Sequence, residues 1–354
     1  MKENNNEYIS INKKYPSNIE RMRNLNKKGF NIMLGLGEAS IGIELLYGYL
    51  INELNATNTL VTLLLALPVV GSCCYFKMSD NKYTKLQELN EYKECTELYD
   101  KFVTSIANLF EKLQIKNPLE IAVLYNYILE KGYLSKDSKY KYHIFKNEDE
   151  LYHELLGTRI TTGYGVCRHN ASLLTDILNK MGNIAATVPV LSSKESDFIQ
   201  KTANINNDQI DGNHCITGML VDDKKVTYDP THRRIGIFAP HKIQNLVINS
   251  PFFALGKGQL KEYPRLAYVL DKSKIVNYYA YPNPDNLEKI LNSEPLILSD
   301  DEILNIFNNA LDRIENADLS EFYNEQKDII ERLAELNNII MPHSDEKLKQ
   351  KQLR

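Results

Sequence analysis

The chain of 354 residues has only five cysteines, no tryptophan and no strong excess of charge of either sign. The cysteines are scattered, which does not match a disulfide framework and favours a reducing compartment. A formal net charge of −4 without a strongly basic face argues against a nucleic-acid binder. The sequence also lacks an internal repeat and a phosphate-cradling G-x-x-x-x-G-K-[ST] loop. These absences exclude a repeat architecture and a P-loop site, and we expect no cofactor.

The residues that are present are those of a folded protein, with 25% charged and 43% apolar residues. The chain is long enough for one large domain or two. Changes in composition divide it into a basic polar N-terminal segment, an apolar region, a central region that opens with helices, and a helical C-terminal region. These parts are residues 1–28, 29–78, 79–280 and 281–354, respectively.

Two apolar runs dominate the N-terminal part, Phe30–Ile51 and the uncharged run Leu60–Phe76. A lipid-spanning helix needs about 20 apolar residues, so Phe30–Phe76 is predicted to form a transmembrane hairpin. Lysines and arginines on both sides predict that both termini and the central region are cytoplasmic, in a bacterial-type cell. Glu38 and Glu44 are costly within a bilayer and favour the alternative, a pair of buried helices.

Helical patterns follow this region and return at the C-terminal end. An apolar stripe predicts a helix within Asp80–Leu113. Asn117 is then expected to cap a helix that ends at Gly132, with Pro118 at its first position and Glu120 closing a capping box. Residues 299–314 and 319–340 read as amphipathic helices, which either pack on the central region or bind a protein partner.

The central region also contains a strand pattern after residue 183. Ile184–Val190 reads as a strand, and residues 192–212 as a long polar loop. HCITGMLV and VTYD then predict an antiparallel hairpin with a turn at residues 222–225. On its first strand, His214 shares a face with Ile216.

A helix with a cysteine at its start precedes these strands, within the stretch Gly163–Gly182. Its apolar residues recur at helical spacing, and Gly182 is a plausible C-terminal stop. Cys167 would therefore lie in the first turn, where unpaired backbone N–H groups and the helix dipole stabilise a thiolate. The alternative is a cysteine that only packs at a helix start.

Cys167, His214 and Asp229 together supply the parts of a thiol nucleophile system. The thiol needs a base to form a thiolate, and the base needs a carboxylate to fix its tautomer and stabilise its charge. The backbone N–H of Cys167 is the expected first donor to an oxyanion, with Tyr164 and Asn213 as weaker side-chain candidates.

A zinc site is the competing use of these residue types, because Cys167, His169, His214 and Cys215 form two close pairs. Residues i and i+2 of a helix do not share a face, and neighbours on a strand point to opposite sides. Four ligands would not converge from these positions, and C-x-x-C is absent. We therefore expect no metal.

The local sequence around these residues resembles the transglutaminase-like superfamily over roughly residues 150–232. The resemblance rests on GYGVCRHNASLLTDILNKMG, the strand that begins at His214, and the ending YDPT. It implies an α+β fold with a papain-like core, in which the helix carrying the nucleophile packs on an antiparallel sheet. It also implies Cys167 as nucleophile, His214 as general base and acid, and Asp229 as orienting carboxylate. One departure is Cys215-Ile216, where many members have a small residue and then tryptophan.

Residues and resemblance together predict a membrane-anchored, cysteine-dependent amide-bond hydrolase that acts on a peptide or protein through a thioester. The same triad would serve a transglutaminase-type acyl transferase, in which an amine replaces water. A non-catalytic binding or scaffold module with the same fold is the third possibility.

Overall fold

A computed structural model of the chain describes most of the central and C-terminal regions. The described residues are 26–37, 67–78, 80, 81, 84, 88, 90–132, 167–194, 213–239, 246–256, 258–270 and 284–340. Residues 26–37 and 67–78 are helical. The further helices are α3 (Asn90–Lys112), α4 (Pro118–Gly132), α7 (Cys167–Lys180), α10 (Pro284–Asn292), α11 (Asp300–Glu315) and α12 (Ser320–Ile340). The strands are β1 (Ala185–Lys194), β2 (Asn213–Val221), β3 (Lys224–Asp229), β4 (Arg234–Phe238), β5 (Leu246–Asn249), β6 (Phe252–Gly256), β7 (Gln259–Glu262) and β8 (Leu266–Leu270).

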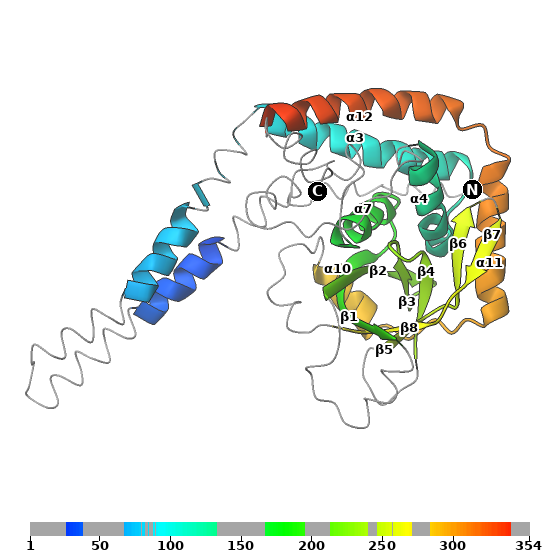
Figure 1. Ribbon diagram of the computed structural model, residues 1–354, viewed down its shortest axis with the longest axis horizontal. Coiled ribbons are helices and arrows are strands. Elements are labelled where there is room, and N and C mark those ends of the chain that lie inside the picture. The colour runs from blue at the N-terminus through cyan, green and yellow to red at the C-terminus, as the bar shows by residue number, and fades with distance from the viewer. Residues whose placement is uncertain are drawn as a thin grey trace, which may run out of the picture.

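Six strands close into an antiparallel barrel in the order β1-β2-β3-β4-β5-β8 (Figure 1). Closure comes from β8, which pairs on one side with β5 and on the other with β1. The remaining two strands, β6 and β7, form a separate two-stranded sheet. Strands β1 to β5 thus pair in the order of the chain. The pairing of β8 with β1 joins two strands that are far apart in the sequence.

The inside of the barrel is apolar toward one end. Alternate residues of β1 point inward because successive side chains on a strand face opposite sides. Val188 and Val190 meet Ile216 of β2 and Val247 of β5 there. Ile290 of α10 packs against the same cluster, so this helix covers the apolar part of the interior.

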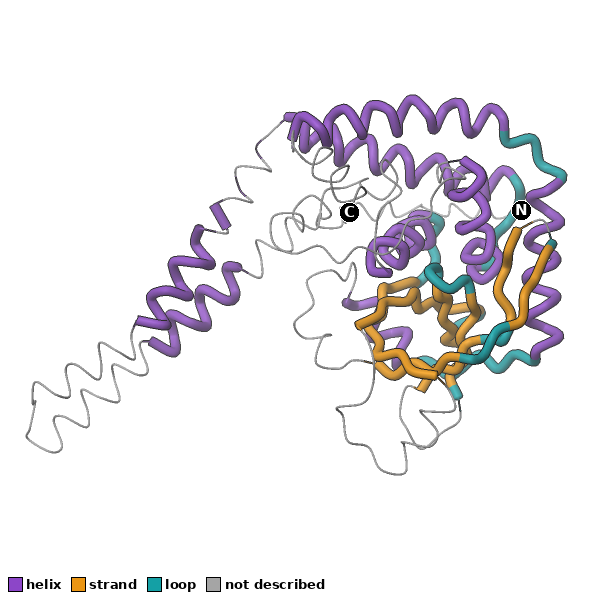
Figure 2. Tube along the Cα trace, viewed as in Figure 1, coloured by secondary structure: helices purple, strands orange, loops and turns teal. Residues whose placement is uncertain are grey.

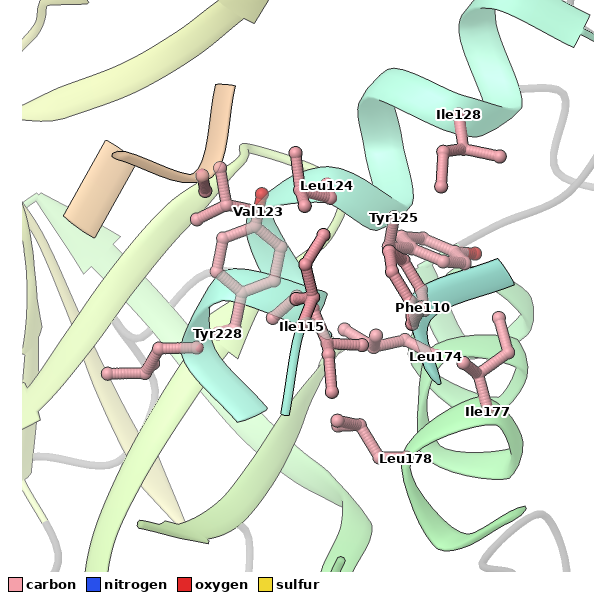
Figure 3. Packing of buried hydrophobic residues seen from close by; sticks show 14 of the residues in the cluster. Phe110, Ile115, Val123, Leu124, Tyr125, Ile128, Leu174, Ile177, Leu178 and Tyr228 are labelled. Carbon is pink, nitrogen blue, oxygen red and sulfur yellow. The ribbon is translucent and has the colours of Figure 1, made fainter. Parts of the chain in front are cut away.

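Helices cover the outside of β1 and β2, and they enclose the larger core. Leu174, Ile177 and Leu178 of α7 pack with Phe110 and Ile115 in one buried cluster (Figure 3). The C-terminal helices join this body: α11 packs on α4, and α12 lies along α3 (Figure 2). Both of the amphipathic helices predicted at the C-terminal end thus bury their apolar faces against their own chain.

Local sequence signals account for several boundaries. Gly182 has a φ of +81°, and the chain around it closes α7 with bonds from Gly182 N to Asn179 O and from Asn183 N to Leu178 O. This is a Schellman motif, which favours glycine at this position, and the predicted stop is confirmed. Between β2 and β3, Asp222 and Asp223 both have positive φ, as a two-residue hairpin turn requires. The turn is thus shorter than the predicted four residues.

Helix caps follow the sequence in one case and depart from it in another. The side chain of Asn117 accepts a hydrogen bond from Leu119 N at 2.9 Å, so α4 begins as predicted. The Glu120 carboxylate, however, accepts a hydrogen bond from Arg313 of α11 at 3.0 Å. Glu120 thus ties α4 to α11. Ser299 and Glu302 form a full capping box at the start of α11.

The predicted α+β papain-like core is wrong as an architecture, because the strands close into a barrel. The hairpin of β2 and β3 is encoded locally, but closure requires β1 to pair with β8. Residues 194 and 266 form one end of that pairing. A period of two along each strand shows which side chains share a face, and it carries no information about a distant partner.

The predicted transmembrane hairpin Phe30–Phe76 is also wrong for the part that the structure describes. Across the described ranges, none of the helices combines the length and the apolar character that crossing a bilayer requires. Residues 26–37 begin with Asn26 and two lysines, and residues 38–66, with Glu38 and Glu44, lie outside the described part. The predicted membrane location, with cytoplasmic termini and a cytoplasmic catalytic domain, depends on that hairpin and is wrong for the same reason.

Candidate active site

Cys167 is the first residue of α7, where the helix leaves backbone N–H groups without intrahelical partners. The helix is held to the barrel wall by polar contacts one and two turns further along. Thr217 of β2 donates a hydrogen bond to the carbonyl of Ala171 at 3.1 Å, and the hydroxyl of Thr175 lies 3.3 Å from that of Thr187 in β1. The thiol is therefore fixed at the end of an anchored helix.

His214 and Asp229 come together on the inner face of the barrel. Gly218 pairs with Thr227 across β2 and β3, so residues at even steps from these two share one face. This register makes His214 and Asp229 diagonal neighbours near the end of the hairpin. His214 Nε2 lies 2.8 Å from Asp229 Oδ2, and Asp229 is 1% exposed.

Asp229 accepts five hydrogen bonds from residues that the structure describes. Its Oδ1 accepts from the backbone N–H groups of Thr231 and His232, at 2.9 and 3.0 Å. Its Oδ2 accepts from His214, from the His232 ring at 2.8 Å and from the Tyr268 hydroxyl at 2.6 Å. Both oxygens are thus occupied, and the carboxylate cannot turn without breaking several bonds.

A second layer of polar groups supports Asp229 from the neighbouring strands. The Tyr268 hydroxyl accepts a hydrogen bond from Asn249 Nδ2 at 3.2 Å, which directs its own proton to Asp229. Arg234 stands opposite Asp229 in the pairing of β3 and β4, and it is 6% exposed. Its guanidinium donates to the carbonyl of Pro264 at 2.6 Å. One end of the barrel interior is therefore polar and hydrogen-bonded.

Helix α4 ties α7, which begins at Cys167, to β3, which ends at Asp229. The Tyr125 hydroxyl donates to the carbonyl of Asn170 in α7 at 3.1 Å. The next residue, Asn126, donates to the carbonyl of Pro230 at 2.8 Å and accepts from the Tyr228 hydroxyl at 3.1 Å. Two adjacent side chains of one helix thus set the spacing between Cys167 and Asp229.

The pKa of the Cys167 thiol is strongly lowered by its neighbours. The hydrogen bond from the Cys215 thiol has the largest effect, and burial acts in the opposite direction. A hydrogen bond from His214, the charge of that ring and the backbone N–H of Cys215 also favour the thiolate, and the pKa falls to about 4. These contacts therefore favour the thiolate form of Cys167 at neutral pH.

The pKa of His214 is raised and the pKa of Asp229 is lowered, so both shifts favour the charged form. Burial by itself would lower the pKa of His214, but the charge and hydrogen bond of Asp229 and the contact with Cys167 raise it to about 10. Burial would likewise raise the pKa of Asp229, but the charge of His214 and the bonds from both histidines hold it well below its usual range. The contacts within the site therefore favour the charged forms of all three groups, a thiolate, an imidazolium and a carboxylate.

Among the described side chains, His214, Asp229 and His232 form a group that could hold a metal ion. The ligand atoms of His214, Asp229 and His232 lie within 4.8 Å of one another. A zinc ion would lie about 2.0–2.2 Å from such atoms and would use their lone pairs. Here both histidine nitrogens lie 2.8 Å from the same carboxylate oxygen, at hydrogen-bonding distance. A bound ion would take Asp229 from His214, so the triad and a metal are exclusive uses of these residues.

The structure thus brings Cys167, His214 and Asp229 together. Of the two weaker oxyanion candidates, Asn213 and Tyr164, it describes only the position of Asn213. Asn213 is the first residue of β2, next to His214, and Tyr164 lies outside the described residues. The backbone N–H of Cys167 lies at the start of α7, and its role as oxyanion donor stays a prediction.

Three further residues of the site were not assigned a role from sequence. Cys215 is adjacent to His214, and His232 follows Asp229 by three residues, so their nearness in the chain was a usable signal. Tyr268 lies on β8, whose approach to Asp229 depends on barrel closure. No local pattern in LAYVL indicates that contact.

Comparison of the chain with protein-family models, with curated proteins and with solved structures finds no match.

Proposed function

We propose that the chain is a cysteine-dependent amide-bond hydrolase with Cys167 as nucleophile, His214 as general acid and base, and Asp229 as orienting carboxylate. The observation that carries the proposal is the continuous set of contacts from the Cys167 sulfur through His214 to Asp229. A cysteine that only packs behaves as Cys95 does: it is buried on α3, and burial raises the pKa of its thiol to about 12. Cys167 is shifted in the opposite direction.

The chemistry follows from these charges. The Cys167 thiolate attacks the carbonyl carbon of the amide, and the oxyanion that forms is stabilised by backbone N–H groups at the start of α7. His214 gives its proton to the leaving amine as the C–N bond breaks, and a thioester remains. His214, now neutral, takes a proton from water, which attacks the thioester and releases the acid. Asp229 holds the ring and stabilises its charged form throughout.

Two considerations support amide chemistry over a scaffold role. A scaffold has no chemical need for a buried carboxylate aimed at a histidine that contacts a thiolate. The local sequence from Gly163 to Gly182 and the YDPT ending also resemble the transglutaminase-like superfamily, although the closed barrel differs from the core that this resemblance implied. The substrate we propose is a peptide or protein amide.

The test is peptide-library profiling of the purified full chain in ¹⁸O-labelled water, with and without an added primary amine. Hydrolysis predicts a product acid that carries one ¹⁸O atom. A product that instead carries the amine identifies acyl transfer, and contradicts hydrolysis as the main reaction.

Cys167→Ala is the test variant and Cys95→Ala the matched control, since each replaces one thiol on a helix. Turnover should be lost in the first and kept in the second. Limiting iodoacetamide at neutral pH should label Cys167 much faster than Cys95. Turnover that survives Cys167→Ala, or equal labelling of both thiols, refutes the nucleophile assignment.

A further inference from the structure

A second thiol lies against the proposed nucleophile. The side chain of Cys215 donates a hydrogen bond to the Cys167 sulfur, and the backbone N–H of Cys215 contacts the same atom. Cys215 is 4% exposed, whereas Cys167 is partly open to solvent. The proposed hydrolysis uses Cys215 for neither proton transfer nor covalent chemistry.

The contact between the two cysteines follows from the way α7 lies along β2. Thr217 bonds to the carbonyl of Ala171, and Cys215 and Cys167 each precede these residues on the same two elements. Four residues of helix advance about 6 Å, and two residues of strand advance about 6.8 Å. The advance from Ala171 back to Cys167 thus matches the advance from Thr217 back to Cys215, and the two cysteines are in contact.

The strand pairing also exposes Cys215 to the helix. The ladder between β2 and β3 begins at Thr217, two residues beyond Cys215, so Cys215 lies past the end of that ladder. The backbone N–H of Cys215 contacts the Cys167 sulfur. Two anchored elements hold the two thiols in contact before any reaction.

We propose that Cys167 and Cys215 are an oxidative modification site, which a hydroperoxide converts into a reversible disulfide. The Cys167 thiolate attacks one oxygen of the hydroperoxide; the O–O bond breaks, Cys167 becomes a sulfenic acid, and the leaving oxygen is protonated to an alcohol or water. The Cys215 sulfur then attacks the sulfenic sulfur, and its proton leaves with the hydroxyl group as water. Two thiols lose two electrons in total, and the hydroperoxide is reduced.

The disulfide would remove the nucleophile and protect it from further oxidation. A sulfenic acid without a neighbouring thiol proceeds to sulfinic acid, which a dithiol reductant does not reverse. The consequence for activity rests on the proposed function, but formation of the bond does not.

The experiment treats the reduced full chain with one to a few equivalents of hydrogen peroxide, blocks free thiols, and maps peptides without reduction by mass spectrometry. We expect a Cys167–Cys215 disulfide, a loss of hydrolysis of at least tenfold, and recovery with dithiothreitol. Cys95→Ser is the control and should behave as the unmodified chain. Cys215→Ser keeps a hydroxyl donor beside Cys167 but should end as sulfinic acid that dithiothreitol cannot rescue.

Two outcomes overturn the disulfide: sulfinic acid at Cys167 in the unmodified chain without a cross-link, or full recovery of Cys215→Ser after reduction. The cross-link is read by mass and not by activity, so the two proposals fail separately. A disulfide in a chain that hydrolyses no peptide contradicts the hydrolase alone. Hydrolysis without a cross-link contradicts the disulfide alone.

Discussion

Replacing Asp229 with asparagine is the most direct test of the charge arrangement in the site. Asparagine has the same shape, and its amide oxygen can still accept from the backbone N–H groups that now bind Oδ1. Its NH₂ group, however, replaces Oδ2, which accepts from His214, the His232 ring and Tyr268. Asp229→Asn therefore removes the charge that holds His214 protonated, with little change of volume.

The size of the effect follows from the bond that is lost. A hydrogen bond to a charged group contributes about 1.5–3 kcal/mol, and one pKa unit corresponds to about 1.4 kcal/mol. The pKa of His214 should therefore fall by about one to two units. Because the charge of His214 helps to keep Cys167 ionised, the pKa of Cys167 should rise in turn. The same free energy lowers kcat/KM about 10- to 150-fold.

The assay is the rate of alkylation of Cys167 by limiting iodoacetamide as a function of pH, followed by mass spectrometry. The unmodified chain should give a midpoint near the lowered pKa of about 4, and Asp229→Asn a clearly higher one. Asp100→Asn is the matched control. Asp100 is 66% exposed, and it binds Lys180 at 2.9 Å, a residue of α7, the helix that begins at Cys167. It should leave the midpoint unchanged.

The reasoning is refuted if Asp229→Asn keeps the unmodified alkylation profile while its circular dichroism and thermal unfolding show a native fold. A shift of equal size in Asp100→Asn would also refute it, because an exposed carboxylate would then act as strongly as the buried one.

Three further predictions use the same structure. Hydrolysis should rise through about pH 4, as Cys167 ionises, and fall through about pH 10, as His214 loses the proton needed by the leaving amine; the pH profile of kcat/KM checks both limbs. Tyr268→Phe removes one donor to Asp229 and should lower the free energy of unfolding by about 1 kcal/mol, measured with denaturant. Gly236→Ala places a Cβ against side chains of the two flanking strands, and should cost about 1–3 kcal/mol in the same measurement without moving the alkylation midpoint.

Much of the local structure could be predicted because it depends on neighbours in the chain. The helix that begins at Cys167 has its own apolar stripe and its own glycine stop. The hairpin that carries His214 and Asp229 has alternating side chains and a turn of two aspartates. In each case the residues that determine the element lie within it, so the candidate triad could be proposed from sequence.

The apolar runs show where such reasoning fails. Length and hydropathy predicted a hairpin across a membrane from Phe30 to Phe76, and no described helix meets that requirement. Hydropathy averages over a run and does not show where a helix begins or which face it covers. The same holds for Glu120, which fits a capping box by position but binds Arg313 on a distant helix.

By itself, the sequence determined which residues can do chemistry and on which local elements they lie: a thiol at a helix start, a histidine and a carboxylate on one face of a hairpin. The tertiary structure alone decided what surrounds them. Barrel closure brings Tyr268 to Asp229, α4 spaces Cys167 from Asp229, and the alignment of α7 with β2 sets Cys215 against Cys167. These contacts join segments far apart in the chain, and their energies depend on burial and distance, which no local pattern contains.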